Sequence, residues 1–345
     1  MAEHVEENLE DMLTELEQMQ RVGLLSPEET RLVVKKRKRF EYKLQKQTKI
    51  KEDILSYIQY ESSLLDLIEM RRAKIGYLHK KNEIDVAISQ RVNKLFRIAE
   101  RRFGPMDTKI WVTHLAFLQR LDWATEAGKV LERFKQVLAH VEDVWIFAAR
   151  FDSNAADESN ARRHLVEGLR IHGSSIPIYR EWFMLELQVL AKTDDKEACH
   201  QMVELAFSNA VEATNEPLFA TELLGLAIKS KIPKTLYQQL KKALMEKHGD
   251  KCSTWASLAA LELYENPLCD NRTLCQKVED ATDVLLNGID KLQSQEMVEE
   301  SIRLLQQVHG TCPGHCNPFM FRILDRANSY NLLSAELTEI HNEYK

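Results

Sequence analysis

The sequence predicts an all-α protein, an α-solenoid of stacked helix–turn–helix repeats that follows an N-terminal helical arm. Three observations predict it. Glycine (11) and proline (8) occur in the 345 residues at roughly half their usual frequencies, which favours long helices. No long segment alternates between apolar and polar residues with a period of two, so strands are not expected. Similar segments recur every 34 to 39 residues, which is the period of helical repeat arrays.

The N-terminal arm is predicted over residues 1–50. Its first 24 residues carry apolar side chains such as Leu9, Leu16 and Met19 at helical spacing. A second helix is expected to start at "SPEE", where Ser26 is a suitable N-cap, Pro27 suits the first helical position, and Glu29 completes a capping box. Because this arm is amphipathic and poor at forming a core alone, we expect it to depend on contact with the repeats or with a partner.

The repeat array is predicted over residues 51–266, and divergent C-terminal helices over 267–345. The shared pattern is a large residue at the first position, often an aromatic or apolar residue three positions later, an apolar residue at six and, in four of the six copies, an acid at seven. On a helix these positions fall within an arc of about 120°, which makes one apolar stripe. The copies are "ILSYIQYE" (54–61), "WVTHLAFL" (111–118), "WIFAARFD" (145–152), "YREWFMLE" (179–186), the weak "LFATELLG" (218–225) and "WASLAALE" (255–262).

The repeated aromatic and acidic residues are interpreted as structural. The aromatic rings could stack on bases, but their regular spacing favours packing between helices. The acids could suggest acid–base chemistry, but their places in successive repeats keep them apart; we expect each to pair with a nearby cation, Asp152 with Arg162 or Arg163. The aromatic residues are Tyr57, Tyr60, Trp111, Trp145, Tyr179, Trp182 and Trp255, and the acids are Glu61, Asp152, Glu186 and Glu262.

No sequence motif indicates catalysis. The chain has no phosphate-binding glycine loop, no HExxH and no G-x-S-x-G. We therefore expect a protein that is not an enzyme, with no cofactor, no metal and no small-molecule substrate.

The basic run Lys35, Lys36, Arg37, Lys38 and Arg39 allows three interpretations. Five consecutive cations cover every face of a helical turn, so they cannot all serve one packed interface. The run could be a solvated helix face, a nuclear import signal or a surface that contacts RNA phosphates, and one surface could serve two of these roles. The net charge of −6 argues against a dedicated nucleic-acid binder, so any contact with RNA would be local.

Six cysteines and the acidic N-terminus favour a reduced, intracellular chain, because no hydrophobic signal segment is evident. No run of 18 apolar residues predicts a membrane span. The stretch "HGTCPGHC" brings together His309, Cys312, His315 and Cys316. A zinc site is one interpretation, but structural zinc sites separate two ligand pairs by a longer loop, so a turn between helices is favoured.

The motifs resemble a known repeat family. Tetratricopeptide repeats share the 34-residue period but place Gly and Tyr after Trp-Leu, which these units lack. A Trp-x-x-aromatic-x-x-apolar-acid helix followed by Ala-Arg resembles HAT (half-a-tetratricopeptide) repeats, and Trp145–Asp152 with Ala161 and Arg162 is the clearest copy. The predicted solenoid is therefore HAT/TPR-like.

The N-terminal segments narrow the resemblance. In order and spacing, "LEQMQRVGLLSPEE", "FEYKLQKQTKIKEDILSYIQYE", "LLDLIEMRRAKIGY" and "DVAISQRVNKLFRIAERRF" resemble the U3 small nucleolar RNA-associated HAT-repeat family of the small-subunit processome. The likeness is strong up to about residue 190. Members of that family are longer and carry more repeats, and the repeat pattern here is lost after about Asn266.

The resemblance implies a scaffold subunit of the UTP-B complex in the nucleus and nucleolus. Its implied partners are WD40 propeller subunits, and the U3 snoRNP and pre-rRNA mostly by indirect contact. Its implied role is to support processome assembly on pre-rRNA and 18S rRNA maturation. Two alternatives stay open: a HAT scaffold in mRNA splicing or 3′-end processing, and an RNA-binding protein that acts through its basic N-terminal helix.

Overall fold

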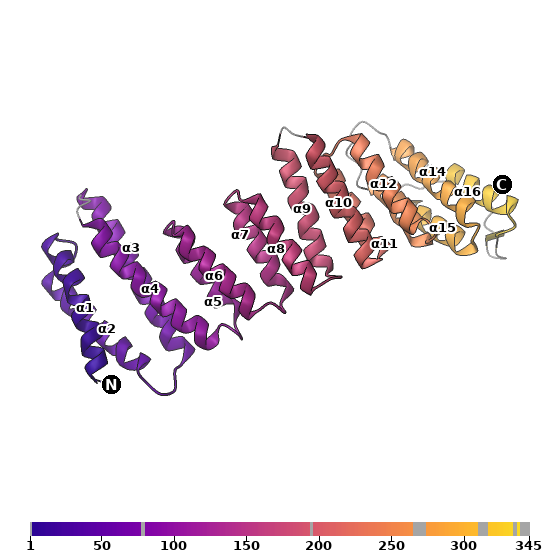
Figure 1. The fold of residues 1–345 in the computed structure, drawn as a ribbon. Coiled ribbons are helices and arrows are strands. Elements are labelled where there is room, and N and C mark those ends of the chain that lie inside the picture. The colour runs from indigo at the N-terminus through magenta and orange to yellow at the C-terminus, as the bar shows by residue number, and fades with distance from the viewer. Residues whose placement is uncertain are drawn as a thin grey trace. The chain divides into compact units, whose positions relative to one another are not determined.

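The computed structural model describes residues 2–76, 80–193, 196–264, 274–309, 317–333 and 337–338. Within these ranges every regular element is a helix, sixteen in all, and there is no strand (Figure 1). The prediction of an all-α, HAT/TPR-like solenoid is confirmed. None of the helices in the described part of the chain is long and apolar enough to cross a membrane.

The chain divides into two compact units, Met1–Leu138 and Ala139–Lys345. In the first, α1 packs on α2, α3 on α4 and α5 on α6. The predicted boundaries at residues 50 and 266 stay a prediction. The helices of this unit are α1 (Ala2–Arg21), α2 (Pro27–Leu44), α3 (Lys51–Ile75), α4 (Lys81–Phe103), α5 (Thr108–Arg120) and α6 (Ala124–Val137).

In the second unit most helices pack on a neighbour in the chain, and several also pack on the helix two places further on, so that α7 contacts α8 and α9 and α13 contacts α14 and α15. This is the contact pattern of stacked helix pairs. The helices are α7 (Glu142–Asn154), α8 (Glu158–Ile171), α9 (Ile176–Lys192), α10 (Lys196–Thr214), α11 (Pro217–Lys229), α12 (Lys234–His248), α13 (Cys252–Tyr264), α14 (Leu274–Leu292), α15 (Gln295–His309) and α16 (Asn317–Ser329).

The predicted start of α2 at "SPEE" is present in full. The Glu29 backbone N–H donates to Ser26 Oγ at 3.2 Å, the Ser26 backbone N–H donates to Glu29 Oε2 at 2.8 Å, and Pro27 is the first helical residue. The two helices of the predicted arm share one hydrophobic core with the next pair, in which Met19 and Val33 pack with Ile54 and Ile88. The arm is thus buried against α3 and α4.

A hydrogen bond that the sequence does not reveal joins the start of a repeat to the turn before it. The large residue that begins the repeat donates from its ring N–H or hydroxyl to a backbone carbonyl six or seven residues earlier in the chain. The polar tip of the ring satisfies this carbonyl while the rest of the ring is buried. The pairs are Trp111 with Gly104 (3.1 Å), Trp145 with Ala139 (3.0 Å), Tyr179 with Gly173 (3.3 Å) and Trp255 with Gly249 (3.0 Å).

Two of these rings pack directly on a glycine in a neighbouring helix. A Cβ atom at Gly168 in α8 would lie 2.9 Å from Cβ and Cγ of Trp145, and one at Gly288 in α14 would lie 2.9 Å from Cγ of Trp255. Neither glycine has a positive φ, so close packing rather than backbone conformation requires it.

We expect Gly168→Ala to lower the free energy of unfolding by about 1–3 kcal/mol, because the added methyl group overpacks the Trp145 ring. Gly128→Ala is the matched control, since Gly128 lies in α6 with nothing within 4 Å of an added Cβ. That change should instead stabilise by about 0.5–1 kcal/mol, because alanine loses less backbone entropy in a helix. Urea unfolding followed by circular dichroism measures both, and equal effects would contradict the packing argument.

Candidate functional site

The first four helices meet at a buried cluster of two arginines and two glutamates. Arg37 in α2 donates two parallel hydrogen bonds to Glu61 in α3, from Nε and Nη2, both at 2.8 Å, and its Nη1 donates to Glu15 in α1. Arg91 in α4 lies 2.8 Å from the Glu15 carboxylate and 3.3 Å from that of Glu61. Two positive charges thus face two negative ones, so each charge that is removed from water has a partner.

The charges around Arg37 keep it ionised in the interior. Burial favours the neutral form, but the negative charges of Glu61 and Glu15 outweigh it, so the pKa of Arg37 is raised above its ordinary value. Next to the cluster, the Tyr57 hydroxyl donates to Glu41 at 2.9 Å. Burial and then the charges of Glu61 and Glu41 raise the pKa of Tyr57, so the hydroxyl stays protonated and remains a donor.

The structure corrects the interpretation of the basic run at one position. The Arg37 side chain has 0% exposure, whereas Lys35, Lys36, Lys38 and Arg39 are exposed. Val33 and Glu41, four residues to either side of Arg37, are also buried, which marks the inward face of α2. In this fold Arg37 therefore cannot contact RNA or an import receptor. Whether the other four do so stays a prediction.

We expect Arg37→Met to lower the free energy of unfolding by about 3–5 kcal/mol, because it leaves Glu15 and Glu61 buried with only Arg91 as a partner. Lys38→Met is the matched control. Lys38 is the next residue in the same run, is exposed, and should change stability by about 0.5 kcal/mol or less. Chemical denaturation of both variants separates a structural arginine from a surface one. A near-neutral Arg37 variant would contradict the buried cluster.

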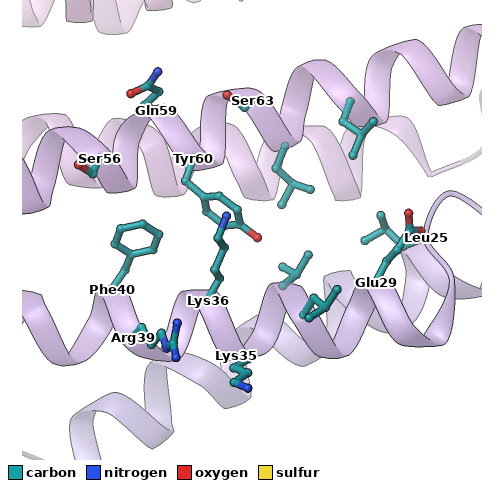
Figure 2. A pocket seen from close by; sticks show the side chains of 14 residues that line it. Leu25, Glu29, Lys35, Lys36, Arg39, Phe40, Ser56, Gln59, Tyr60 and Ser63 are labelled. Carbon is teal, nitrogen blue, oxygen red and sulfur yellow. The ribbon is translucent and has the colours of Figure 1, made fainter.

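An open groove lies between α2 and α3, beside the inward face of α2 that carries Arg37 (Figure 2). Its volume is about 800 Å³, and most of its lining is apolar, with Val33 and Phe40 from α2 and Leu64 and Leu67 from α3. Lys35, Lys36 and Arg39 line it on the α2 side. Ser56, Gln59 and Ser63 line it on the α3 side, so one side is positively charged and the other is neutral and polar.

Two aromatic side chains, Phe40 and Tyr60, line the groove. Phe40 stacks on the buried Tyr57 with ring centroids 4.8 Å apart and an interplanar angle of 5°. Lys36 Nζ lies over the Tyr60 ring, 4.8 Å from its centroid, and Figure 2 shows the two side chains approaching each other. Both aromatic rings of the groove therefore already pack against another side chain of the protein.

Glu29 and Arg71 lie at one end of the groove and tie α2 to α3. Arg71 donates from both terminal nitrogens to the Glu29 carboxylate, at 2.6 and 2.8 Å, and also to the Leu24 carbonyl at 2.7 Å. The hydrogen bond from Arg71, together with the capping bond from the Ser26 backbone, lowers the pKa of Glu29 to about 2. Glu29 is therefore ionised at every physiological pH.

This pKa shift predicts how Glu29→Gln depends on pH. A carboxyl whose pKa is lower in the folded state contributes stability above its unfolded pKa of about 4.5, and this contribution is lost as the pH falls towards 2. At pH 7 we expect the variant to be less stable by about 1 kcal/mol, the range of an N-cap and a partly exposed ion pair.

Thermal unfolding at a series of pH values checks this. The difference in Tm between the wild type and the variant should be constant from pH 7 to about 5 and should shrink below pH 4.5. Glu28→Gln, which changes the neighbouring exposed acid, is the control. A difference that grows in acid would contradict the sign of the shift.

The repeat acids are paired between helices, as expected, but with one different partner. Arg162 in α8 donates to both oxygens of Glu186 in α9, at 2.7 and 2.9 Å. Trp182 Nε1 lies 3.2 Å from Glu186 Oε1. Asp152 accepts its contact from His164 Nε2 at 2.9 Å, not from Arg162 or Arg163. Arg162 reaches the next helix pair instead, because it lies on the side of α8 that faces α9. Glu262 is 3.5 Å from Lys241.

The predicted repeat residues contact one another only within a repeat, as Trp182 does with Glu186, among the contacts of the described residues. Trp111, Trp145, Tyr179, Trp182 and Trp255 are each buried in the pair of helices to which they belong, and Tyr60 is half-buried at the groove. No described group of three His, Cys, Asp or Glu residues could hold a metal ion. The sequence cluster His309, Cys312, His315 and Cys316 lies outside the described side chains.

Comparison with known proteins confirms the resemblance found in the sequence. A family model described as U3 small nucleolar RNA-associated protein 6 matches residues 9–92. A human protein named U3 small nucleolar RNA-associated protein 6 homolog is 31% identical over 283 residues, which is 76% of this chain and 47% of the human protein. The mouse homolog is 29% identical over the same shares. A Schizosaccharomyces pombe protein named U3 small nucleolar RNA-associated protein 6 is 29% identical over 56% of this chain and 39% of its own length.

The chain therefore spans about half the length of the human and mouse relatives. The match covers more of the chain than residues 1–190, over which the sequence motifs were clearest. The crystal structure of the APC/C hetero-tetramer Cut9-Hcn1 aligns with 90% of this chain and 59% of that one at 10% identity, but its TM-score of 0.30 is too low to support a conclusion.

Proposed function

We propose that this chain, as a relative of the U3 small nucleolar RNA-associated protein 6 homologs, is a non-enzymatic scaffold subunit of the small-subunit processome. The observation that carries the proposal is the 31% identity to the human homolog over 283 residues, together with the family match over residues 9–92. In this role it supports assembly on pre-rRNA and the maturation of 18S rRNA.

The arrangement of charged residues supports a scaffold rather than an enzyme. The acids that recur in the repeats each face a cation or histidine of a neighbouring helix, and each contact serves to hold two helices together. Acid–base catalysis would need two such groups to converge on one pocket. Stacked helix pairs instead offer long surfaces that suit protein partners.

The proposed partners follow from the relatives' names and from the family resemblance. They are the U3 snoRNP and pre-rRNA, contacted mostly through other proteins, and the WD40 propeller subunits of UTP-B. The proposed location is the nucleolus. The exposed Lys35, Lys36, Lys38 and Arg39 suit a nuclear import signal or an auxiliary phosphate contact, since such contacts position a protein without reading sequence.

Affinity purification of the tagged chain from nuclear extract tests this function. We expect U3 RNA and processome propeller subunits to co-purify, because a scaffold is held by several surfaces at once. Retention after ribonuclease treatment would indicate contacts through protein rather than RNA. A co-purifying set that consists of splicing or 3′-end-processing proteins, without U3 RNA, would overturn the proposal in favour of the other HAT-repeat role.

A further inference from the structure

We infer that the groove between α2 and α3 is a docking site for an amphipathic helix of a partner protein, one that carries acidic residues along one edge of its apolar stripe. The inference rests on the scaffold function proposed above, since it names the surface and the kind of partner. It is carried by three properties of the groove, namely its apolar lining, the distribution of charge on its two sides, and its length.

The apolar lining is larger than the fold needs. Val33 and Leu64 are buried at the base of the groove and belong to the core of the first unit, whereas Leu32 at its edge is 64% exposed. Phe40 and Leu67 are only partly buried. An exposed leucine beside partly buried apolar residues is the anatomy of a surface that a partner's apolar side chains complete.

The charges select the chemistry of the partner. Lys35, Lys36 and Arg39 all line the α2 side, and none of them forms an ion pair with a carboxylate in the described part of the chain. They stand out in a chain whose net charge is −6. The single lining acid, Glu29, is already neutralised by Arg71. The acidic flank of a partner helix would therefore be attracted to α2. Its other flank, which faces the neutral Ser56, Gln59 and Ser63, would be uncharged.

The length fits a short helix. The lining runs from Glu29 to Phe40 on α2 and from Ser56 to Leu67 on α3, twelve residues in each case, which is about 17 Å along a helix. A partner segment of about three turns would fill it. In such a segment, apolar residues at positions i, i+3 or i+4, and i+7 would face the lining, with the acids on one side of them.

Single-stranded RNA is a poorer occupant. Bases are held by stacking on free aromatic faces, but Phe40 is stacked on Tyr57 and the Tyr60 ring is covered by Lys36. An apolar lining also contributes nothing to phosphate binding. The cations alone would suit RNA, and an RNA probe is therefore one arm of the test.

In the experiment, a displayed library of 14-residue helical peptides is selected for binding to the full chain. The peptides have a fixed leucine stripe and random residues at the flanking positions. We expect selected peptides to be enriched in Asp and Glu on one flank only. One selected peptide is then labelled, and its affinity is measured by fluorescence anisotropy with the wild type and with two charge-reversal variants.

The matched pair is Lys36→Glu and Lys38→Glu. Both reverse one exposed charge in the same run of α2, but only Lys36 lines the groove. We expect Lys36→Glu to weaken binding about tenfold and Lys38→Glu by about twofold or less at about 0.1 M salt, because at this ionic strength screened attraction falls off within about 10 Å. Leu32→Asp should abolish binding, with the circular dichroism spectrum unchanged since this side chain is exposed.

Four results would overturn the inference: selection of no peptide, selection of peptides with basic or neutral flanks, equal effects of the two lysine variants, or displacement of the peptide by a 12-nucleotide oligouridine at equal concentration. Self-association through the groove, seen as a dimer in sedimentation equilibrium that Leu32→Asp dissolves, would also overturn it in favour of a second copy. The scaffold function fails independently, if U3 RNA is absent from the purification while the peptide still binds.

Discussion

The N-terminal fold depends on a buried ion pair between Arg37 and Glu61, which joins the second helix of one pair to the first helix of the next. The same connection recurs between Arg162 and Glu186, again 24 residues apart and again with two parallel hydrogen bonds, and in a looser form between Lys241 and Glu262. Because an unpaired charge in the interior is strongly unfavourable, each pair fixes the register of two helix pairs. By this criterion α1 and α2 form a helix pair of their own.

Ring hydrogen bonds at the starts of α5, α7, α9 and α13 add to these ion pairs. A tryptophan or tyrosine that starts a helix pair satisfies a carbonyl of the turn before it, while its ring packs in the interior and in three cases against a glycine. Polar atoms of a repeat are thereby used in holding the turn that precedes it. This explains why side chains that resemble catalytic or base-stacking groups in sequence have structural roles here.

The inward position of Arg37 also determines where the neighbouring basic side chains of α2 lie on the surface. Since successive residues on a helix point about 100° apart, an inward Arg37 places Lys36 and Arg39 beside the groove and Lys38 away from it. The basic run therefore has three environments, in the interior, along the groove and in solvent. The groove lies between two sets of contacts that join α2 to α3, the rings of Phe40, Tyr57 and Tyr60 on one side and the Glu29–Arg71 ion pair on the other.

The sequence by itself determined the helical class, the repeat period, the start of α2 at Ser26 and the family resemblance, because local capping chemistry and the spacing of large apolar residues are written in consecutive positions. It could not assign partners. Asp152 pairs with His164 while Arg162 reaches Glu186, a choice that depends on which side of α8 faces which neighbour. Nor could it separate Arg37 from four similar cations. Five adjacent charges have equal local chemistry, and only the packing of α2 against α1, α3 and α4 decided which of them lies in the interior.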